Sequence, residues 1–276
     1  MNNIDVPSDV VSVEWLHNNI DADNLIVLDG SIPKVSGQII DYTETLIPRT
    51  QFFDIKKTFS DISGRFPNTL PKVEHFSKEV RNFGINTDSA IVVYDCHGIY
   101  SSARVWWMFK HFGHDNVAVL DGGLSEWIDK DFRTVSSYHE NQKIGDFEVS
   151  NEDNRIIDFE GLKGFIGLYD TSILDARSTK RFTGETPEPR QGLRSGTIPN
   201  SLNLPYSEVL DGNKLKSKSE LITIFENLTK EKHTIIFSCG TGITACVLAL
   251  AANKAGYQKI KVYDGSWTEY GSLVNA

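Results

Sequence analysis

Cys239 is the residue of this chain whose setting best suits covalent chemistry. It follows the β-branched run TIIFS and precedes the sequence GTGITA, after which an alanine- and leucine-rich segment begins. This order predicts a strand that ends at the cysteine and a helix that starts soon after it. Ligands bind at such strand ends in parallel sheets. The pattern favours a nucleophilic thiol, with a small packing residue at a tight turn as the alternative.

The loop CGTGIT at 239–244 is suited to stabilising an anion. Gly240 and Gly242 permit backbone angles that other residues resist. Successive backbone N–H groups can then turn inward at the start of the following helix, where they favour negative charge. We therefore expect Cys239 to react as a thiolate without help from a neighbouring histidine.

Two other cysteine chemistries fit the sequence less well. A tyrosine-phosphatase loop needs an arginine six residues after its cysteine, where this chain has Ala245. A dithiol pair with Cys246 needs the two Cα atoms within about 7 Å, whereas most of the intervening chain is expected to be helical, rising about 1.5 Å per residue. We expect Cys246 to pack in the core and Cys96 to have no reactive role.

Short β-branched strands alternate with helical patterns around this loop. The expected strands of the second half lie at 173–176, 234–238 and 260–264. The expected helices lie at 217–228 and between the cysteine loop and Gly256, a glycine suited to ending a helix. Strands separated by helices predict an α/β fold with a parallel sheet that helices cover on both faces.

The chain contains an internal repeat with a period of about half its length. The segment AIVVYDCHGI at 90–99 matches TIIFSCGTGI at 234–243, and NLIVLDGS at 24–31 recurs as TSILDARS at 171–178. Such a period is too long for a solenoid and indicates two similar domains. The match places Asp95 opposite the loop cysteine, so only the second copy can do thiol chemistry at this point.

The join between the copies is expected in a polar stretch. The sequence TVSSYHENQKIGD at 134–146 has the composition of a linker. We therefore place a first domain at 1–137, the linker at 138–146, and a second domain, which contains the cysteine loop, at 147–276.

The composition argues against several classes of function. A net charge of −9 over 276 residues, with no block of basic residues, speaks against a nucleic-acid partner. No apolar run approaches the roughly 18 residues of a membrane span, and the N-terminus lacks the pattern of a signal peptide. The three cysteines form neither a disulfide framework nor a zinc signature. We expect a metal-free protein of the reducing cytoplasm.

Several motifs together resemble the rhodanese superfamily, and closely its 3-mercaptopyruvate sulfurtransferase branch. The motifs are CGTGITA at 239–245, RFTGETPEPRQGLRSGTIPNSLNLP at 181–205, YSSARVWWMFKHFGH at 100–114 and LDGGLSEW at 120–127. The resemblance covers almost the whole chain. It implies two tandem rhodanese-like domains, an inactive first one and a catalytic second one.

The resemblance also implies a reaction. Cys239 would take a sulfane sulfur from 3-mercaptopyruvate, become a persulfide, and pass the sulfur to a thiol, a thioredoxin-like protein or cyanide. Two alternatives stay open: thiosulfate as the donor, or a persulfide carrier with negligible turnover. No metal or organic cofactor is implied, and we expect a monomer.

The family pattern assigns the site residues. Arg181 and Arg190 would hold the carboxylate and carbonyl of the donor, a task that suits the planar guanidinium fork. Thiosulfate-preferring relatives carry a basic pair directly after the cysteine, where this chain has Gly240 and Thr241. The catalytic residues implied are Cys239 and Thr241, and the substrate-binding residues are Arg181, Arg190, Gly240, Gly242, Ile243 and Thr244.

The first half departs from the family pattern at two positions. Relatives commonly have an acidic residue after FFDI and a histidine in an HMLP-like segment, proposed to assist proton transfer. This chain has Lys56 and Asn68 at the matching places. The resemblance thus leaves the proton source open, with water or the donor's own thiol proton as the expected substitute.

Overall fold

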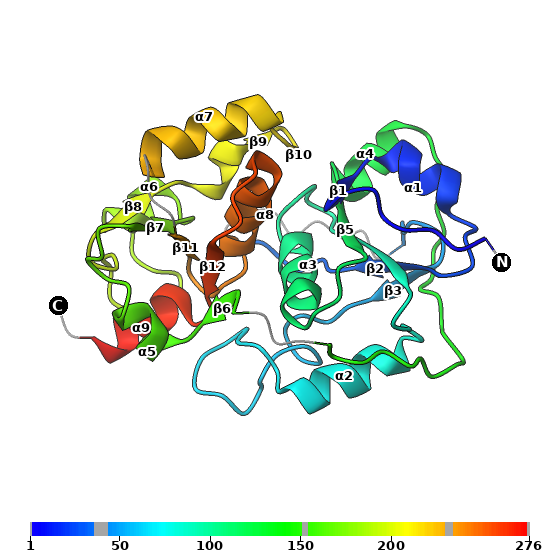
Figure 1. Cartoon of the computed structure of the whole chain (residues 1–276), viewed down its shortest axis with the longest axis horizontal. Coiled ribbons are helices and arrows are strands. Elements are labelled where there is room, and N and C mark those ends of the chain that lie inside the picture. Colours follow the sequence, from blue (N-terminus) through cyan, green and yellow to red (C-terminus); the bar gives the residue numbers. More distant parts are fainter. Residues whose placement is uncertain (1, 36–43, 151–153, 230–233, 275–276) are drawn as a thin grey trace. The chain divides into compact units, whose positions relative to one another are not determined.

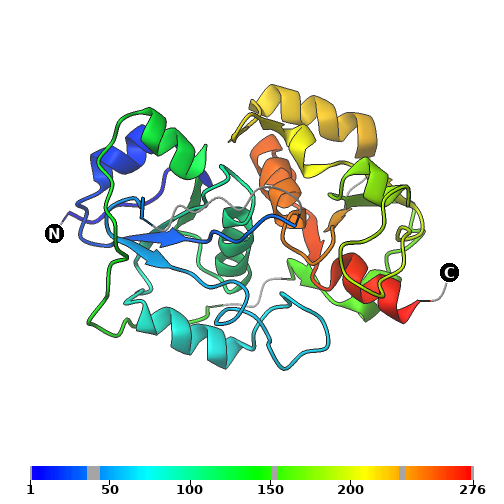
Figure 2. The ribbon, with the colours of Figure 1, turned by 180° about the vertical axis from the view of Figure 1, so that it is seen from behind.

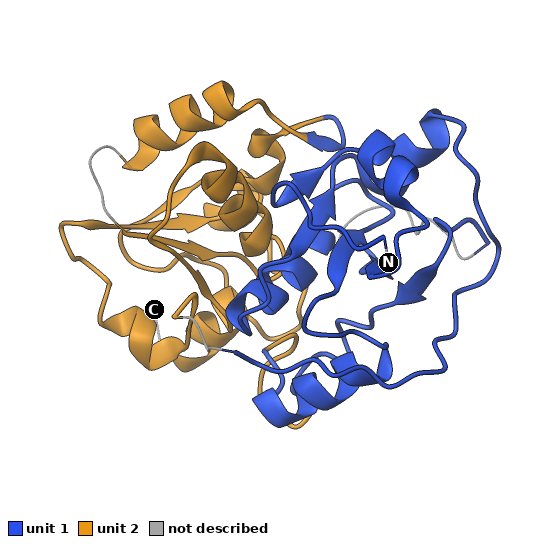
Figure 3. Ribbon diagram, turned by 45° about the vertical axis from the view of Figure 1, so that its right-hand side comes forward, with its two compact units in different colours: residues 1–62, 70–153, 212–214 blue, residues 63–69, 154–211, 215–276 orange. Residues whose placement is uncertain are grey.

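The computed structural model describes residues 2–35, 44–150, 154–229 and 234–274, which form two compact units (Figures 1 and 3). Unit 1 comprises Met1–Ile62, Leu70–Asp153 and Gly212–Lys214, and unit 2 comprises Ser63–Thr69, Asn154–Asp211 and Leu215–Ala276. Unit 2 therefore contains the cysteine loop together with a short segment from the first half of the sequence. The linker expected at 138–146 stays a prediction.

Unit 1 is built on a parallel sheet of five strands in the order β1-β5-β4-β2-β3. The strands are β1 (Val10–Val11), β2 (Leu25–Asp29), β3 (Thr50–Phe52), β4 (Ala90–Tyr94) and β5 (Val117–Leu120). The helices are α1 (Val13–Asn19), α2 (Val73–Asn82), α3 (Ser102–His111) and α4 (Gly123–Asp129).

Helices cover both faces of the unit 1 sheet, and its central strand, β4, is therefore buried on both sides. Every residue of β4 is buried, which explains the unbroken apolar sequence AIVVY. Val92 and Tyr94 belong to the core that includes Leu16 of α1 and Trp127 of α4. On the other face an aromatic cluster joins α2 and α3. Its members include Phe53, Phe59, Phe76, Phe109 and Phe112.

Unit 2 is built on a second parallel sheet, in the order β6-β12-β11-β7-β8. The strands are β6 (Ile156–Ile157), β7 (Thr171–Asp175), β8 (Ser201–Asn203), β11 (Thr234–Ser238) and β12 (Ile260–Tyr263). The helices are α5 (Phe159–Lys163), α6 (Thr179–Phe182), α7 (Lys218–Thr229), α8 (Ala245–Ala255) and α9 (Ser266–Leu273). A 3₁₀ helix spans Tyr206–Val209, and the short strands β9 (Leu210–Asp211) and β10 (Lys214–Leu215) pair with each other.

Helices cover both faces of the unit 2 sheet (Figures 1 and 2). Helices α7 and α8 pack together on one face, where Phe225 of α7 meets Phe237 of β11. Helices α5 and α9 cover the other face, with Leu162 and Trp267 in one core with Ile236. The α/β prediction, with parallel sheets covered on both faces, is therefore confirmed.

The two sheets follow the same topology, which confirms the internal repeat. In both units the central strand is followed by a loop and then by a helix, β4 to α3 in unit 1 and β11 to α8 in unit 2. Helix α8 ends at Gly256, whose φ of 106° is the left-handed angle expected of a C-terminal glycine. None of the described helices combines the length and apolar composition that crossing a bilayer demands.

Candidate active site

Cys239 lies at the carboxyl end of β11, at the centre of the unit 2 sheet. Its side chain is buried, with the residue 2% exposed, and α8 starts six residues later at Ala245. Gly242 has a φ of 77°, so the expected left-handed glycine is confirmed there. For Gly240 that expectation is wrong, because its φ is not positive. A Cβ at Gly240 would instead lie 3.0 Å from Nη2 of Arg181, so the missing side chain makes room for a guanidinium.

The equivalent loop of unit 1 surrounds a carboxylate, that of Asp95. Asp95 follows β4 as Cys239 follows β11, and Oδ2 of its buried carboxylate accepts consecutive backbone N–H groups. The donors are Tyr100 at 2.8 Å, Ser101 at 2.9 Å and Ser102 at 2.9 Å. The loop therefore gathers N–H groups around an anion, and Cys239 is the residue of unit 2 that aligns with Asp95.

The repeat identifies the corresponding donors of unit 2. Gly98 and Gly242, which align, both have a positive φ, so the two loops turn alike. The N–H groups that match those around Asp95 belong to Thr244, Ala245 and Cys246. The Cys246 N–H already donates to the Ile243 carbonyl at 3.1 Å. Thr244 and Ala245, at the start of α8, are therefore the residues whose N–H groups align with those that bind the Asp95 carboxylate.

The first turn of α9 holds the backbone of the cysteine loop. The Trp267 N–H donates to the Cys239 carbonyl at 3.0 Å. Thr268 donates to the Gly240 carbonyl from its N–H at 3.0 Å and from its hydroxyl at 2.7 Å. These bonds satisfy the carbonyl groups of Cys239 and Gly240. Helix α9 therefore holds the backbone of the loop in place.

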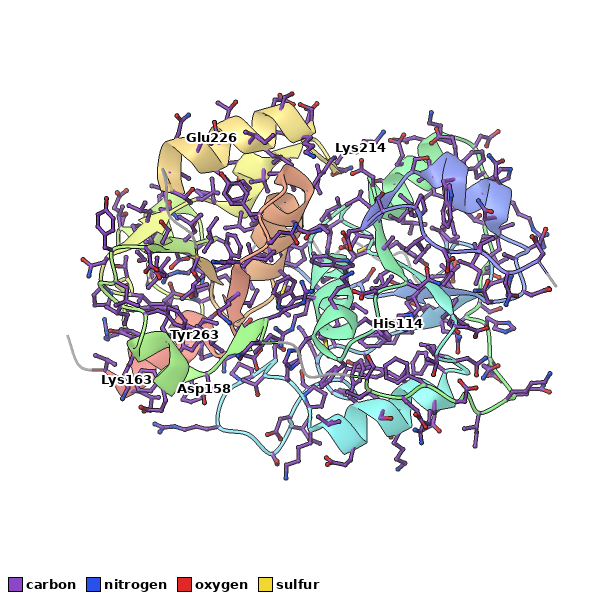
Figure 4. All side chains as sticks on the ribbon, viewed as in Figure 1. His114, Asp158, Lys163, Lys214, Glu226 and Tyr263 are labelled. Atoms are coloured by element: carbon purple, nitrogen blue, oxygen red, sulfur yellow. The ribbon has the colours of Figure 1, made fainter. Side chains whose placement is uncertain are left out.

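Ser266, also in this turn, is a site residue that the sequence reasoning missed. It is fully buried with a φ of 49°, a left-handed angle that costs a serine about 1–3 kcal/mol. Its Oγ accepts the Cys239 N–H at 3.1 Å, donates to the carbonyl of Tyr263 (labelled in Figure 4) at 2.9 Å, and lies 4.0 Å from the Cys239 sulfur. Unit 1 has Gly123, with a φ of 57°, at this place. The replacement of this glycine by a serine in the second copy of the repeat was the sequence signal that could have identified Ser266.

A chain of alternating charges leads from the sheet to the cysteine loop. Arg177, whose side chain is fully buried, pairs with Asp175 at 2.7 Å and with Glu188 at 2.7 Å. The second oxygen of Glu188 pairs with Nη2 of Arg181 at 2.5 Å. Arg181, on α6, is the partly exposed end of this chain, and its guanidinium lies against Gly240.

The inner pair of this chain is buried and held by charged hydrogen bonds. Burial raises the pKa of Asp175 and, acting alone, would lower that of Arg177. The hydrogen bonds and charges of Asp175 and Glu188 outweigh burial and raise the pKa of Arg177. Nε and Nη2 of Arg177 together contact both Asp175 oxygens, which is the bidentate geometry of a charged pair.

Arg181 and Arg190 differ in their surroundings. Nε of Arg181 is buried and has no hydrogen-bond partner among the described residues. A buried N–H of this kind calls for an acceptor, so Arg181 is suited to receive an anion beside Gly240. Arg190 is exposed in the turn after Glu188, and its side chain makes no hydrogen bond or ion pair with any residue the structure describes. A role for Arg190 stays a prediction.

The remaining residues named from the sequence lie as follows. Ile243 is buried, Thr244 is the N-cap of α8, and Thr241 is partly buried. The Thr241 hydroxyl accepts a hydrogen bond from Nδ2 of Asn68 at 2.9 Å, within unit 2. Lys56 is exposed and belongs to unit 1, where its N–H donates to Asp54.

All three cysteines are free thiols, but only Cys239 has the setting of a nucleophile. Cys246 is fully buried in α8, and its thiol donates to the Gly242 carbonyl at 3.2 Å, so its prediction as a core residue is confirmed. Burial raises the pKa of Cys96 to about 11, which keeps that thiol protonated and unreactive near neutral pH.

We expect Glu188→Gln to weaken both stability and donor binding. The buried Arg177 and the adjoining Arg181 share this carboxylate, and removing one partner of a buried ion pair typically costs about 3–5 kcal/mol. Thermal unfolding should occur at lower temperature, and kcat/KM for an anionic donor should fall. Glu185→Gln, in the same segment but exposed and, among the described residues, bonded to Thr183 alone, is the matched control and should change neither. Equal melting temperatures for the two variants would contradict the role of Glu188.

Comparison with known proteins places these features in a known context. Residues 12–130 and 159–273 both match the rhodanese-like domain family. The chain is 37% identical to thiosulfate/3-mercaptopyruvate sulfurtransferase 1, mitochondrial, of Arabidopsis thaliana, over 95% of this chain and 76% of that protein. It is 34% identical to human 3-mercaptopyruvate sulfurtransferase, over 95% of this chain and 91% of that protein.

A solved structure resembles the whole chain. It is the crystal structure of SseA from Escherichia coli, described as a 3-mercaptopyruvate sulfotransferase of the rhodanese fold. The two structures superpose with a TM-score of 0.84 at 32% sequence identity, over 94% of this chain and 99% of SseA.

Proposed function

The chain belongs to the rhodanese-like domain family, and on that premise we propose that it is a sulfurtransferase. It moves a sulfane sulfur from 3-mercaptopyruvate to a thiol or cyanide through a persulfide on Cys239. The observation that carries the proposal is the position of Cys239, at the end of the central strand, where the repeat holds a carboxylate among converging N–H groups. The relatives that the chain matches carry the names of such enzymes.

The first half-reaction forms the persulfide. The Cys239 thiolate attacks the thiol sulfur of the donor, and a bond forms between the two sulfur atoms. The carbon–sulfur bond of the donor breaks, and its electron pair remains on the organic fragment as the enolate of pyruvate, which then takes up a proton. Covalent catalysis of this kind splits a difficult transfer into two easier steps.

The second half-reaction restores the enzyme. An acceptor thiolate or cyanide attacks the outer sulfur of the persulfide, the sulfur–sulfur bond breaks, and Cys239 leaves as a thiolate. The loop at the start of α8 stabilises the anionic sulfur in both steps, by analogy with the N–H groups that the matching loop of unit 1 directs to the Asp95 carboxylate. No external oxidant is needed, because the electron pair of the broken carbon–sulfur bond leaves with the carbon that becomes the methyl group of pyruvate, and this loss raises the sulfur to the oxidation state of a persulfide.

Arg181 selects the donor. Its Nε, which has no partner among the described residues, is a donor for the carboxylate of 3-mercaptopyruvate, and Gly240 lets the guanidinium lie beside the cysteine loop. Glu188 holds the guanidinium in this direction. The loop lacks the basic pair that thiosulfate-preferring relatives carry after the cysteine, and has Gly240 and Thr241 there instead.

The acceptor and the setting belong to the same proposal. A thiol or a thioredoxin-like protein is the expected acceptor, and a monomer in a reducing compartment such as the cytoplasm is the expected state. The three free thiols suit such a compartment, since oxidising ones favour disulfides.

A comparison of the two donors tests this function. With cyanide as acceptor, we expect thiocyanate and pyruvate in equal amounts from 3-mercaptopyruvate, at a higher kcat/KM than for thiosulfate. A preference for thiosulfate would refute the donor assignment and leave the persulfide mechanism in place. Stoichiometric loading of sulfur without turnover on either donor would identify a persulfide carrier instead.

A further inference from the structure

A short segment from the first half of the sequence is part of the catalytic unit. Residues Ser63–Thr69 lie between β3 and α2 in the chain, yet they group with unit 2 (Figure 3). Asn68 in this segment has a φ of 61°, a left-handed angle that asparagine adopts more readily than most residues. Its side chain reaches Thr241, 173 residues away in sequence and two residues beyond Cys239.

The chemistry of this contact determines what the Thr241 hydroxyl can do. Nδ2 of Asn68 carries only donor hydrogens, and it lies 2.9 Å from Oγ1 of Thr241. Oγ1 therefore accepts in this bond, and its single proton cannot return to Nδ2. The proton must point to a different acceptor. We propose that Asn68 is a positioning residue that fixes the Thr241 hydroxyl as a hydrogen-bond donor to the reacting sulfur donor, an inference that rests on the proposed function.

The step that this hydroxyl would assist is the loss of the organic fragment. As the carbon–sulfur bond breaks, its electron pair becomes enolate charge on the carbonyl oxygen of the donor. A hydroxyl already aimed at that oxygen stabilises the charge without transferring its proton, and the enolate carbon takes its proton from water. Thiosulfate forms no enolate, so its turnover depends less on this contact.

Asn68 performs this task without titrating. An amide keeps its donor hydrogens throughout the range of about pH 5 to 8 in which a histidine would change charge. Of the neighbouring groups, the Arg181 guanidinium at Gly240 is permanently charged, and Cys239 is the nucleophile itself. The orientation of the Thr241 hydroxyl is therefore independent of pH across this range.

The first test removes the donor from position 68. We expect Asn68→Ala to slow single-turnover persulfide formation from 3-mercaptopyruvate by about 2- to 13-fold, the worth of one neutral hydrogen bond, with KM nearly unchanged. Asn68→Gly, which suits the left-handed backbone at least as well, should be equally slow. Recovery of the wild-type rate in Asn68→Gly would overturn the proposal, because the residue would then serve only the backbone.

A second test asks whether the effect acts through Thr241. In the Thr241→Val background, Asn68→Ala should cause no further loss, since the hydroxyl that it orients is absent. Additive losses would contradict a shared role. Asn68→His should add an inflection to the pH profile of this step between about pH 5 and 8 that the wild type lacks; an unchanged profile would also contradict the contact.

The failure of this inference can be told from the failure of the proposed function. Intact mass of each variant after donor treatment reports whether Cys239 gains a sulfur at all. If the wild type gains none, the sulfurtransferase proposal fails. If the wild type and Asn68→Ala gain it at the same rate, only the role of Asn68 fails.

Discussion

We expect the replacement of Cys239 by serine to abolish sulfur transfer from any donor. A serine hydroxyl in the same loop can neither ionise near neutral pH nor accept a sulfane sulfur as a thiolate does, so the first half-reaction has no nucleophile. The small change in volume leaves the loop's contacts with Ser266, Trp267 and Thr268 in place. The measurement is the steady-state rate of thiocyanate production, with circular dichroism and thermal unfolding to show that the variant is folded.

The other two cysteines are the matched controls for this experiment. Cys246→Ser keeps a hydroxyl that can donate to the Gly242 carbonyl as the thiol does, and Cys96→Ser changes a residue of unit 1. Both should retain most of the wild-type rate. A loss in either control comparable with that in Cys239→Ser would mean that the assignment of the nucleophile is wrong.

Replacing Arg181 by alanine should lower kcat/KM for 3-mercaptopyruvate by roughly 10- to 150-fold. The expected loss is that of a hydrogen bond to a charged group, about 1.5–3 kcal/mol. Arg181→Lys should recover little, because a lysine cannot replace both Nη2 on Glu188 and the free Nε. Kinetics with both donors and cyanide provide the measurement.

Neighbouring basic residues provide the comparison for Arg181. Lys180→Ala removes an exposed charge of the same helix and should leave kcat/KM within about twofold, as expected for a screened surface group. Arg190→Ala tests the second donor-binding arginine that the family pattern implies. Wild-type kinetics in Arg181→Ala would contradict the assignment of this residue to the donor carboxylate.

Much of the fold could be predicted from local sequence patterns. The β-branched run at 234–238 is β11, and Gly256 ends α8, because burial on both faces and the left-handed C-terminal turn each demand particular residue types. The internal repeat also identified Asp95 as the counterpart of Cys239. That pairing depends on a shared topology, which the sheets display.

The contacts that complete the site could not be predicted in this way. Asn68 reaches Thr241 across 173 residues, and no local pattern assigns the segment Ser63–Thr69 to unit 2. The strained Ser266 looks like an ordinary residue at a helix start until its φ and its contact with Cys239 are known. Gly240 was expected to serve the backbone, but the structure shows that it makes room for Arg181. Each of these depends on tertiary packing.

The mass of the intact protein after treatment with 3-mercaptopyruvate tests the central claim most directly. The account predicts a gain of one sulfur atom per chain, located on the peptide that contains Cys239, and its complete loss when cyanide is added. The Cys239→Ser protein should gain nothing under the same conditions. A sulfur that remains on the Cys239→Ser protein, or a wild type that gains none, would contradict the claim that Cys239 carries the transferred sulfur.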